Sequence, residues 1–185
     1  MRGAAWPWLT LATAGAAVAL LCAAPAMAAP APTLEAAVKA TYLYKFAPFV
    51  TWPGGDPSQA FNICVVGDDP FGAQLDRAVT GQSYNGRPIQ IVRLAAVTAQ
   101  SPCAIAFLGG SATQSVAAGL KVLHNTPILT VTDEGQPAGI IAYEMQDDHV
   151  RFRIDQGAAE DGGLVISSKL LSLALSVRTR HVVQP

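Results

Sequence analysis

The segment Gly67-Asp68-Asp69-Pro70-Phe71-Gly72 contains residue types that could bind a phosphate or a metal ion. It has neither the Gly-Lys-Ser/Thr ending of a Walker loop nor the three spaced glycines of a dinucleotide loop. Two carboxylates would also repel a phosphate, and the chain shows no further ligands for a metal. Asp69 before Pro70 is typical of a helix start, because aspartate caps helices and proline suits the first helical position. We therefore expect a turn beside a crevice, and the candidate crevice or partner surface is Asp68, Asp69, Pro70 and Phe71.

A search for a nucleophile gives Ser167 and Ser168, with His124, His149 and His181 as the available histidines. Neither serine lies in a Gly-x-Ser-x-Gly elbow, and no histidine or carboxylate spacing points to them. The cysteine and histidine spacings of common metal sites are also missing. The residues therefore predict no catalytic group, no metal and no cofactor, and the chain is not expected to be an enzyme.

The amino-terminal stretch predicts export. Arg2 precedes a nearly uncharged apolar run over 3–21, and Ala26-Met27-Ala28 fits the small-residue pattern of a signal-peptide cleavage site. We expect residues 1–28 to be removed by cleavage after Ala28. A retained membrane anchor is the alternative, but the closing residues favour cleavage, so the mature chain is not expected to span a membrane. Residues 29–33 are expected to be a mobile leader.

The cysteine count changes when the signal peptide leaves. Cys22 lies within it, and Leu21 stands where a lipoprotein signal wants a small residue. The mature chain then has two cysteines, Cys64 and Cys103, and an exported protein with two cysteines is a candidate for one disulfide. A bond between them would close the loop from residue 64 to residue 103. In the chain-entropy model, closing such a loop stabilises the folded state by roughly 4 kcal/mol.

Apolar spacing in the first part of the mature chain predicts alternating helices and strands. Leu34, Val38, Tyr42 and Phe46 recur at helical spacing, with Thr33 as the N-cap and Pro48 as the end. An extended segment is expected over 49–53. Strands are then expected at 61–66, 89–94, 103–108 and 126–132, with helices at 70–80 and 111–123, a turn at 83–88 and a short helical piece at 95–100.

The pattern changes after residue 138. Two strands at 139–145 and 149–155 predict an antiparallel hairpin, followed by a helical turn at 157–161. A closing helix capped by Ser167 or Ser168 is expected to bury Leu170, Leu171, Ala174, Leu175 and Val177. The whole predicts a three-layer α/β fold with a mostly parallel, doubly wound central sheet, a C-terminal antiparallel hairpin and a closing helix. A single domain is expected over 34–178, with a polar tail at 179–185.

The doubly wound order would place the first strand beside the third, so Cys64 and Cys103 would lie on adjacent strands. Their registers stay uncertain, because Cys64 is in the middle of its strand and Cys103 opens the other.

Charge adds little to the search for partners. Loss of Arg2 leaves 11 basic against 13 acidic residues. Without a basic patch, nucleic acid is not an expected partner.

Several blocks of residues follow one another in an order typical of one family. They are Lys39-Ala40-Thr41-Tyr42-Leu43-Tyr44-Lys45-Phe46-Ala47 with Trp52-Pro53, Cys64-Val65-Val66-Gly67-Asp68-Asp69-Pro70-Phe71-Gly72, Gly86-Arg87-Pro88-Ile89, Cys103 before an apolar strand, Val150-Arg151-Phe152-Arg153-Ile154-Asp155, and Gly163-Leu164-Val165-Ile166-Ser167-Ser168-Lys169-Leu170-Leu171. Together, from about Glu35 to Val177, these blocks resemble the YfiR family.

This resemblance implies a periplasmic α/β protein without catalysis. In the best-known member, the protein binds the periplasmic sensor of an inner-membrane diguanylate cyclase and limits cyclic-di-GMP output and biofilm formation. A disulfide there joins cysteines matching Cys64 and Cys103, and its redox state affects repression. That member also has a second cysteine pair near the hairpin, whereas residues 138–145 of this chain contain no cysteine.

The leading hypothesis is thus a periplasmic, non-catalytic regulator that represses a membrane-bound diguanylate cyclase through its periplasmic sensor. A periplasmic small-molecule-binding module, using the crevice near Gly67 to Pro70, is the alternative. A hydrolase built on Ser167 or Ser168 is a third hypothesis. The sequence leaves open whether the chain forms a homodimer.

Overall fold

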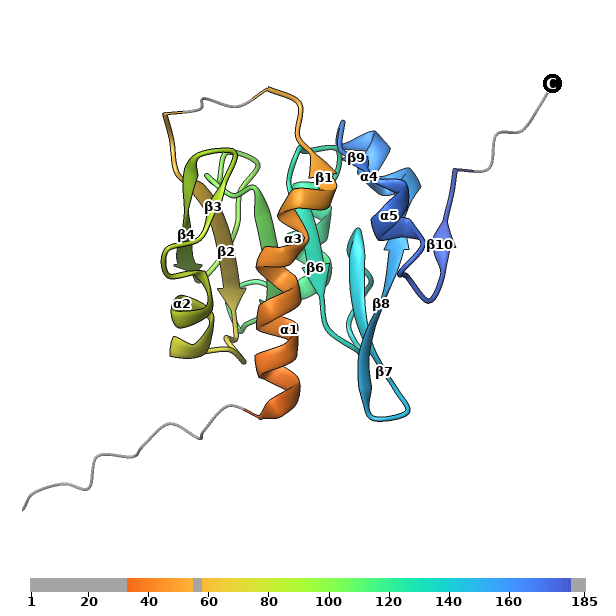
Figure 1. The fold of residues 1–185 in the computed structure, drawn as a ribbon, viewed down its shortest axis with the longest axis horizontal. Helices are drawn as coiled ribbons and strands as arrows, with labels where there is room; N and C mark the ends of the chain where they lie inside the picture. Colours follow the sequence, from red (N-terminus) through yellow and green to blue (C-terminus); the bar gives the residue numbers. More distant parts are fainter. Residues whose placement is uncertain (1–32, 55–57, 181–185) are drawn as a thin grey trace, which may run out of the picture. The chain divides into compact units, whose positions relative to one another are not determined.

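The first long strand of the fold is β2, Phe61–Gly67, in a computed structural model that describes residues 33–54 and 58–180 (Figure 1). It pairs in parallel with β4, Arg87–Leu94, on one side and with β5, Ile105–Gly110, on the other. The parallel set continues through β6, Leu129–Thr132, to β7, Ile141–Gln146. The first long strand therefore lies inside the sheet beside the third, which confirms the predicted doubly wound arrangement.

Antiparallel pairs flank the parallel strands on both sides, β3, Ser83–Tyr84, with β4 and β8, His149–Asp155, with β7, and β10, Val177–Arg178, pairs in parallel with β8 at the outer edge. The strand order of the sheet is β10-β8-β7-β6-β5-β2-β4-β3. β7 and β8 form the predicted hairpin, with Asp147 and Asp148 at positive φ in its turn. Along β8, Val150, Phe152 and Ile154 are buried, whereas the residues between them are more exposed, as the alternating sequence predicts.

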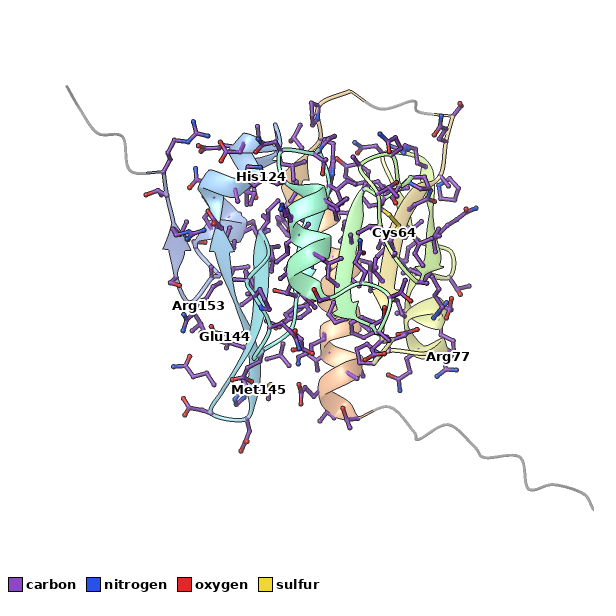
Figure 2. All side chains as sticks on the ribbon, turned by 180° about the vertical axis from the view of Figure 1, so that it is seen from behind. Cys64, Arg77, His124, Glu144, Met145 and Arg153 are labelled. Atoms are coloured by element: carbon purple, nitrogen blue, oxygen red, sulfur yellow. A yellow bond between two sulfur atoms is a disulfide. The ribbon has the colours of Figure 1, made fainter. Side chains whose placement is uncertain are left out.

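Helices on both faces give the sheet its three layers. α1, Leu34–Lys45, and α2, Ala73–Val79, pack on one face, and α3, Val116–Leu123, packs on the other (Figures 1 and 2). α1 begins as predicted, because the Thr33 hydroxyl accepts a hydrogen bond from the Ala36 N–H at 3.2 Å. Ala40 and Leu43 bury the inner side of α1 in the larger of two apolar clusters.

Two helices begin later than the sequence predicted. The expected start of α2 at Pro70 is wrong, because the Asp69 carboxylate accepts the Phe71 and Gly72 N–H groups in a separate turn. Gly72, at φ +49°, then turns the chain before the helix begins at Ala73. The expected start of α3 near Ser111 is also wrong. The Ser111 hydroxyl closes a local turn with the Thr113 and Gln114 N–H groups, and Ser115 is the N-cap.

Two further local predictions are corrected. Residues 95–100 contain bends and a turn instead of a short helix, because the Gln114 side chain bonds both the N–H and the carbonyl of Val97. The segment expected to be extended over 49–53 begins with a 3₁₀ turn, η1, at Ala47–Phe49. Its extended part is β1, Val50–Thr51, which pairs with β9, Val165–Ile166, in a small second sheet.

The closing helix is shorter than predicted. α4, Gln156–Asp161, occupies the expected helical turn, but α5 covers only Ser168–Leu171, with Ser167 as its N-cap. The chain then runs along β8, where the Leu175 N–H bonds the Phe152 carbonyl and the Ser176 carbonyl accepts the Ile154 N–H. Backbone groups on an open strand edge need partners, and this requirement ends the helix before β10.

The expected signal peptide, its cleavage after Ala28 and almost all of the expected leader lie outside the described residues, as does the end of the polar tail. Among residues 33–54 and 58–180, no helix has both the length and the apolar character needed to cross a membrane.

Candidate functional site

The turn after β2 places the four candidate surface residues in different environments. Asp68 and Pro70 are exposed and Asp69 is half-buried. Phe71 has no exposed surface, because its ring packs edge-on against Phe107 at a centroid distance of 4.7 Å. A partner could therefore reach Asp68 and Pro70, whereas Phe71 belongs to the core.

Arg93 of β4 holds this turn against α2. Its Nε donates to Asp69 at 2.8 Å, and its two terminal nitrogens donate to the two oxygens of Asp76 at 3.0 and 2.7 Å. A further bond reaches the Gly72 carbonyl at 3.0 Å. The hydrogen bond from Arg93 lowers the pKa of Asp76 below its usual 3.8, and the same bond raises the pKa of Arg93. The Asp69 carboxylate is thus paired with an arginine, so its presence at the turn can be explained without a metal ion or a ligand.

Close backbone contact also shapes this end of the sheet. The Asp68 N–H donates to the Gly110 carbonyl at 2.8 Å. A Cβ added to Gly109 would lie 2.1 Å from the Asp68 carbonyl oxygen, and one on Gly67 would lie 2.2 Å from the Gly110 oxygen. Only glycine fits at either position, so the ends of β2 and β5 meet backbone to backbone.

Cys64 and Cys103 are joined by a disulfide in the structure, with their Cα atoms 5.7 Å apart (Figure 2). Asn62 positions the segment before β5, because its carbonyl accepts the Ala104 N–H and its side chain donates to the Pro102 carbonyl. Cys64 is fully buried and Cys103 is 8% exposed, within the apolar cluster beneath α3. A soluble reductant therefore has little access to the sulfurs while the domain stays folded.

A buried polar cluster beneath α1 was missed by the sequence reasoning. Lys39 is 4% exposed and donates to Glu35 and, at 2.5 Å, to Asp133, while its carbonyl accepts the Tyr143 hydroxyl at 2.9 Å. Burial lowers the pKa of Lys39, but the hydrogen bonds to Asp133 and Glu35 outweigh it, so the pKa is raised. Burial also raises the pKa of the Tyr143 phenol well above its usual value. The cluster fastens α1 to the sheet with its charges paired.

The serines and histidines form no catalytic arrangement in the described part of the chain. The Ser167 hydroxyl accepts the Leu170 N–H at 3.3 Å, which is the role of an N-cap. His149 contacts the Asp147 carbonyl, and His181 lies outside the described residues. No group of histidine, cysteine or carboxylate side chains suited to a metal ion occurs among residues 33–54 and 58–180.

Two concave surfaces lie away from the turn after β2. One, of about 380 Å³, is bordered by His124 and by the ion pairs Arg178–Asp155 and Arg180–Asp161. The other, of about 410 Å³, lies beside Cys103. Its wall includes three contacting aromatic rings, Trp52, Phe61 and Tyr84. The residues Asp68 to Phe71 line neither surface.

The comparison with protein families gives a match. A family model described as YfiR/HmsC-like matches residues 36–175, from within α1 to just beyond α5. This range is more than half of the 185 residues and contains the disulfide and the parallel strands. No curated protein matches the chain.

Proposed function

The chain belongs to the YfiR/HmsC-like family, and we propose that it represses a membrane-bound diguanylate cyclase by binding the sensor domain that the cyclase exposes to the periplasm. At the level of the family, the assignment supports a periplasmic regulator of a diguanylate cyclase that is not itself a catalyst. The family match over residues 36–175 is the observation that carries the proposal.

Other features agree with this proposal. A disulfide between Cys64 and Cys103 is consistent with export to an oxidising compartment. The signal sequence expected over residues 1–28 would take the chain there. Repression would lower cyclic-di-GMP and with it biofilm formation, and the protein would act through binding alone.

Co-purification tests the proposal directly. A tagged chain expressed in its own host should co-purify with an inner-membrane diguanylate cyclase, and deletion of its gene should raise cyclic-di-GMP. Re-expression of the exported chain should restore the lower level. Failure to associate, together with unchanged cyclic-di-GMP after deletion, would refute the proposed function.

A periplasmic small-molecule-binding module is the second candidate. Its support is the concave surface bordered by His124, because about 380 Å³ lies within the size range of ligand pockets, roughly 300–1,000 Å³. The crevice near Gly67 to Pro70 is a separate candidate for a ligand site and stays a prediction. A small molecule that raises the melting temperature, combined with a deletion that leaves cyclic-di-GMP unchanged, would favour this function.

A further inference from the structure

An apolar groove lies where α1, β8 and α5 meet. Its volume is about 210 Å³, and its lining includes the buried side chains Phe46 and Phe152, whose rings meet edge to face at 5.3 Å. Tyr42 extends this aromatic wall, with its ring 6.1 Å from that of Phe152. The volume falls below the roughly 300 Å³ at which pockets for small molecules begin. The groove therefore suits one or two side chains of a protein partner better than a whole ligand.

The edge of the groove exposes apolar surface. Leu173 lines it and is 57% exposed, although removal of a leucine side chain from water stabilises a protein. Phe49, which is half-buried, also lines it. A wall of fixed aromatic rings next to an exposed leucine is the kind of surface in which an anchoring side chain is buried at protein interfaces.

The charges at the groove are all positive. Lys45 and Arg151 line it, and no aspartate or glutamate does. The Lys169 ammonium lies 5.7 Å from the centre of the Phe49 ring. Within residues 33–54 and 58–180, none of these three cations forms an ion pair. They are therefore available to a carboxylate from outside the chain.

The same charges decide between two occupants. A second copy of the chain, related by a two-fold axis through the groove, would bring the same cations against each other. A segment with acidic residues would instead pair with them and exclude water from the aromatic wall.

We propose that this groove is the docking surface for a protein partner, and that it receives a segment in which a leucine or aromatic side chain is flanked by carboxylates. On the proposed function, on which this inference rests, that segment belongs to the cyclase sensor. The apolar side chain fills the groove, and the carboxylates meet Lys45 and Lys169.

A peptide of stated chemistry tests the groove without the cyclase. The mature chain is titrated with a blocked, dye-labelled peptide of sequence Glu-Glu-Leu-Phe-Glu-Glu and with its counterpart in which lysine replaces glutamate, and fluorescence anisotropy reports binding. We expect the acidic peptide to bind at least about tenfold more tightly, and to weaken as salt screens the charges. Absence of binding at millimolar peptide, or equal binding of both peptides, would overturn the proposal.

Matched variants locate the peptide. Lys45→Glu reverses a charge in the last turn of α1, and Lys121→Glu makes the same change in the last turn of α3 on the opposite face of the sheet. Leu173→Ser removes an exposed leucine from the groove, and Leu34→Ser removes one outside it. Binding should weaken about tenfold in Lys45→Glu and severalfold in Leu173→Ser, and remain unchanged in the two controls. Equal losses in the groove variants and the controls would contradict this placement.

The same variants in the host separate this inference from the proposed function. If the unaltered chain lowers cyclic-di-GMP and Lys45→Glu and Leu173→Ser lower it equally well, the groove is not the docking surface and the proposed function stands. If the groove variants bind the cyclase less well and cyclic-di-GMP rises, both hold. If the unaltered chain has no effect on cyclic-di-GMP, the proposed function fails and the cyclase sensor is excluded as the occupant.

Discussion

Arg93 has more interactions than an exposed side chain normally makes, because one guanidinium joins two carboxylates and a backbone carbonyl from consecutive parts of the chain. Its partners are Asp69, Asp76 and Gly72. An isolated exposed ion pair contributes little, since salt and side-chain entropy offset most of its attraction. Here the planar fork binds Asp76 through two parallel hydrogen bonds, which is the geometry in which such pairs contribute most.

Replacement of Arg93 by glutamine should destabilise the domain by about 1 kcal/mol, the upper end for exposed pairs, because both carboxylates lose their partner. The free energy of unfolding in urea at pH 7 gives the value. Arg77→Gln on α2 is the matched control, since Arg77 is exposed and, in the described part of the chain, its side chain forms no ion pair with Asp69 or Asp76. If Arg77→Gln loses as much stability as Arg93→Gln, the ion pairs of the Arg93 guanidinium are not what stabilises the domain.

The effect of Arg93 should depend on pH in a defined direction. Because folding lowers the pKa of Asp76, its ionised form stabilises the folded state above the unfolded value of 3.8. That contribution is lost as pH falls through the lower folded value. The difference in unfolding free energy between the unaltered chain and Arg93→Gln should therefore be constant near neutrality and shrink below pH 3.8. A difference that grows on acidification would be inconsistent with this assignment.

The two cysteines act on stability through the loop that they close. The bond spans 39 positions, and Asn62 holds Cys103 beside β2. The double variant Cys64→Ala, Cys103→Ala should lose about 2–4 kcal/mol, because the unfolded chain regains the entropy of the open loop. Urea unfolding of the oxidised chain, the reduced chain and the double variant measures this loss. The reduced chain and the double variant should have the same free energy of unfolding.

Protein taken from the periplasm should show no free thiol without reductant. Two reactive thiols in that protein would refute the bond.

At the scale of elements, the contact between the ends of β2 and β5 depends on the absence of side chains. Gly109→Ala should destabilise the domain by more than about 2 kcal/mol, because its Cβ would overlap the Asp68 carbonyl and a backbone shift would break the sheet there. Gly119→Ala is the matched control, since its Cβ would meet Leu108 at 3.5 Å, an ordinary contact within α3. Alanine there should stabilise by about 0.5–1 kcal/mol. Thermal unfolding of both variants tests the contrast, and similar melting temperatures would contradict it.

The elements that the sequence predicted well are those whose pattern is decided locally. β2 is a continuous apolar run ending at Gly67, as expected for a buried parallel strand, and β8 alternates apolar and charged residues. α5 was predicted too long because Leu170, Leu171 and Ala174 have helical spacing. The unpaired edge of β8, which is distant in sequence, ends that helix. β1 and β9 have two residues each, too few for any periodicity.

The candidate site shows the same division. The signal for the Lys39 cluster was present in part, since Glu35 precedes Lys39 by four residues on α1 and such pairs meet on a helix surface. Asp133 directly follows β6, 94 positions further along the chain, and no local pattern connects it to Lys39. Phe71 was proposed as part of a crevice or partner surface because it follows a turn. Its ring instead packs in the core against Phe107. The groove at α1 and α5 could not be found, since its walls come together only in the folded chain.

At the scale of the whole molecule, compartment and covalent state are linked. The same chain would keep both thiols reduced in the cytoplasm and would form its disulfide only after export. Export also decides which side of the membrane the protein can reach. A protein that acts on a periplasmic sensor must cross the membrane, whatever its stability.

A chain without residues 2–28 should therefore stay in the cytoplasm, contain free Cys64 and Cys103, and leave cyclic-di-GMP at the level of the deletion strain. Loss of repression could come from location or from the missing disulfide. The exported double variant Cys64→Ala, Cys103→Ala separates the two, because it reaches the periplasm without the bond. If the exported variant represses in proportion to its abundance whereas the cytoplasmic chain does not, location decides and the disulfide contributes stability alone. Thiol labelling of fractionated cells and cyclic-di-GMP measurement give both readouts. Repression by the cytoplasmic chain would show that it acts on a target other than a periplasmic sensor.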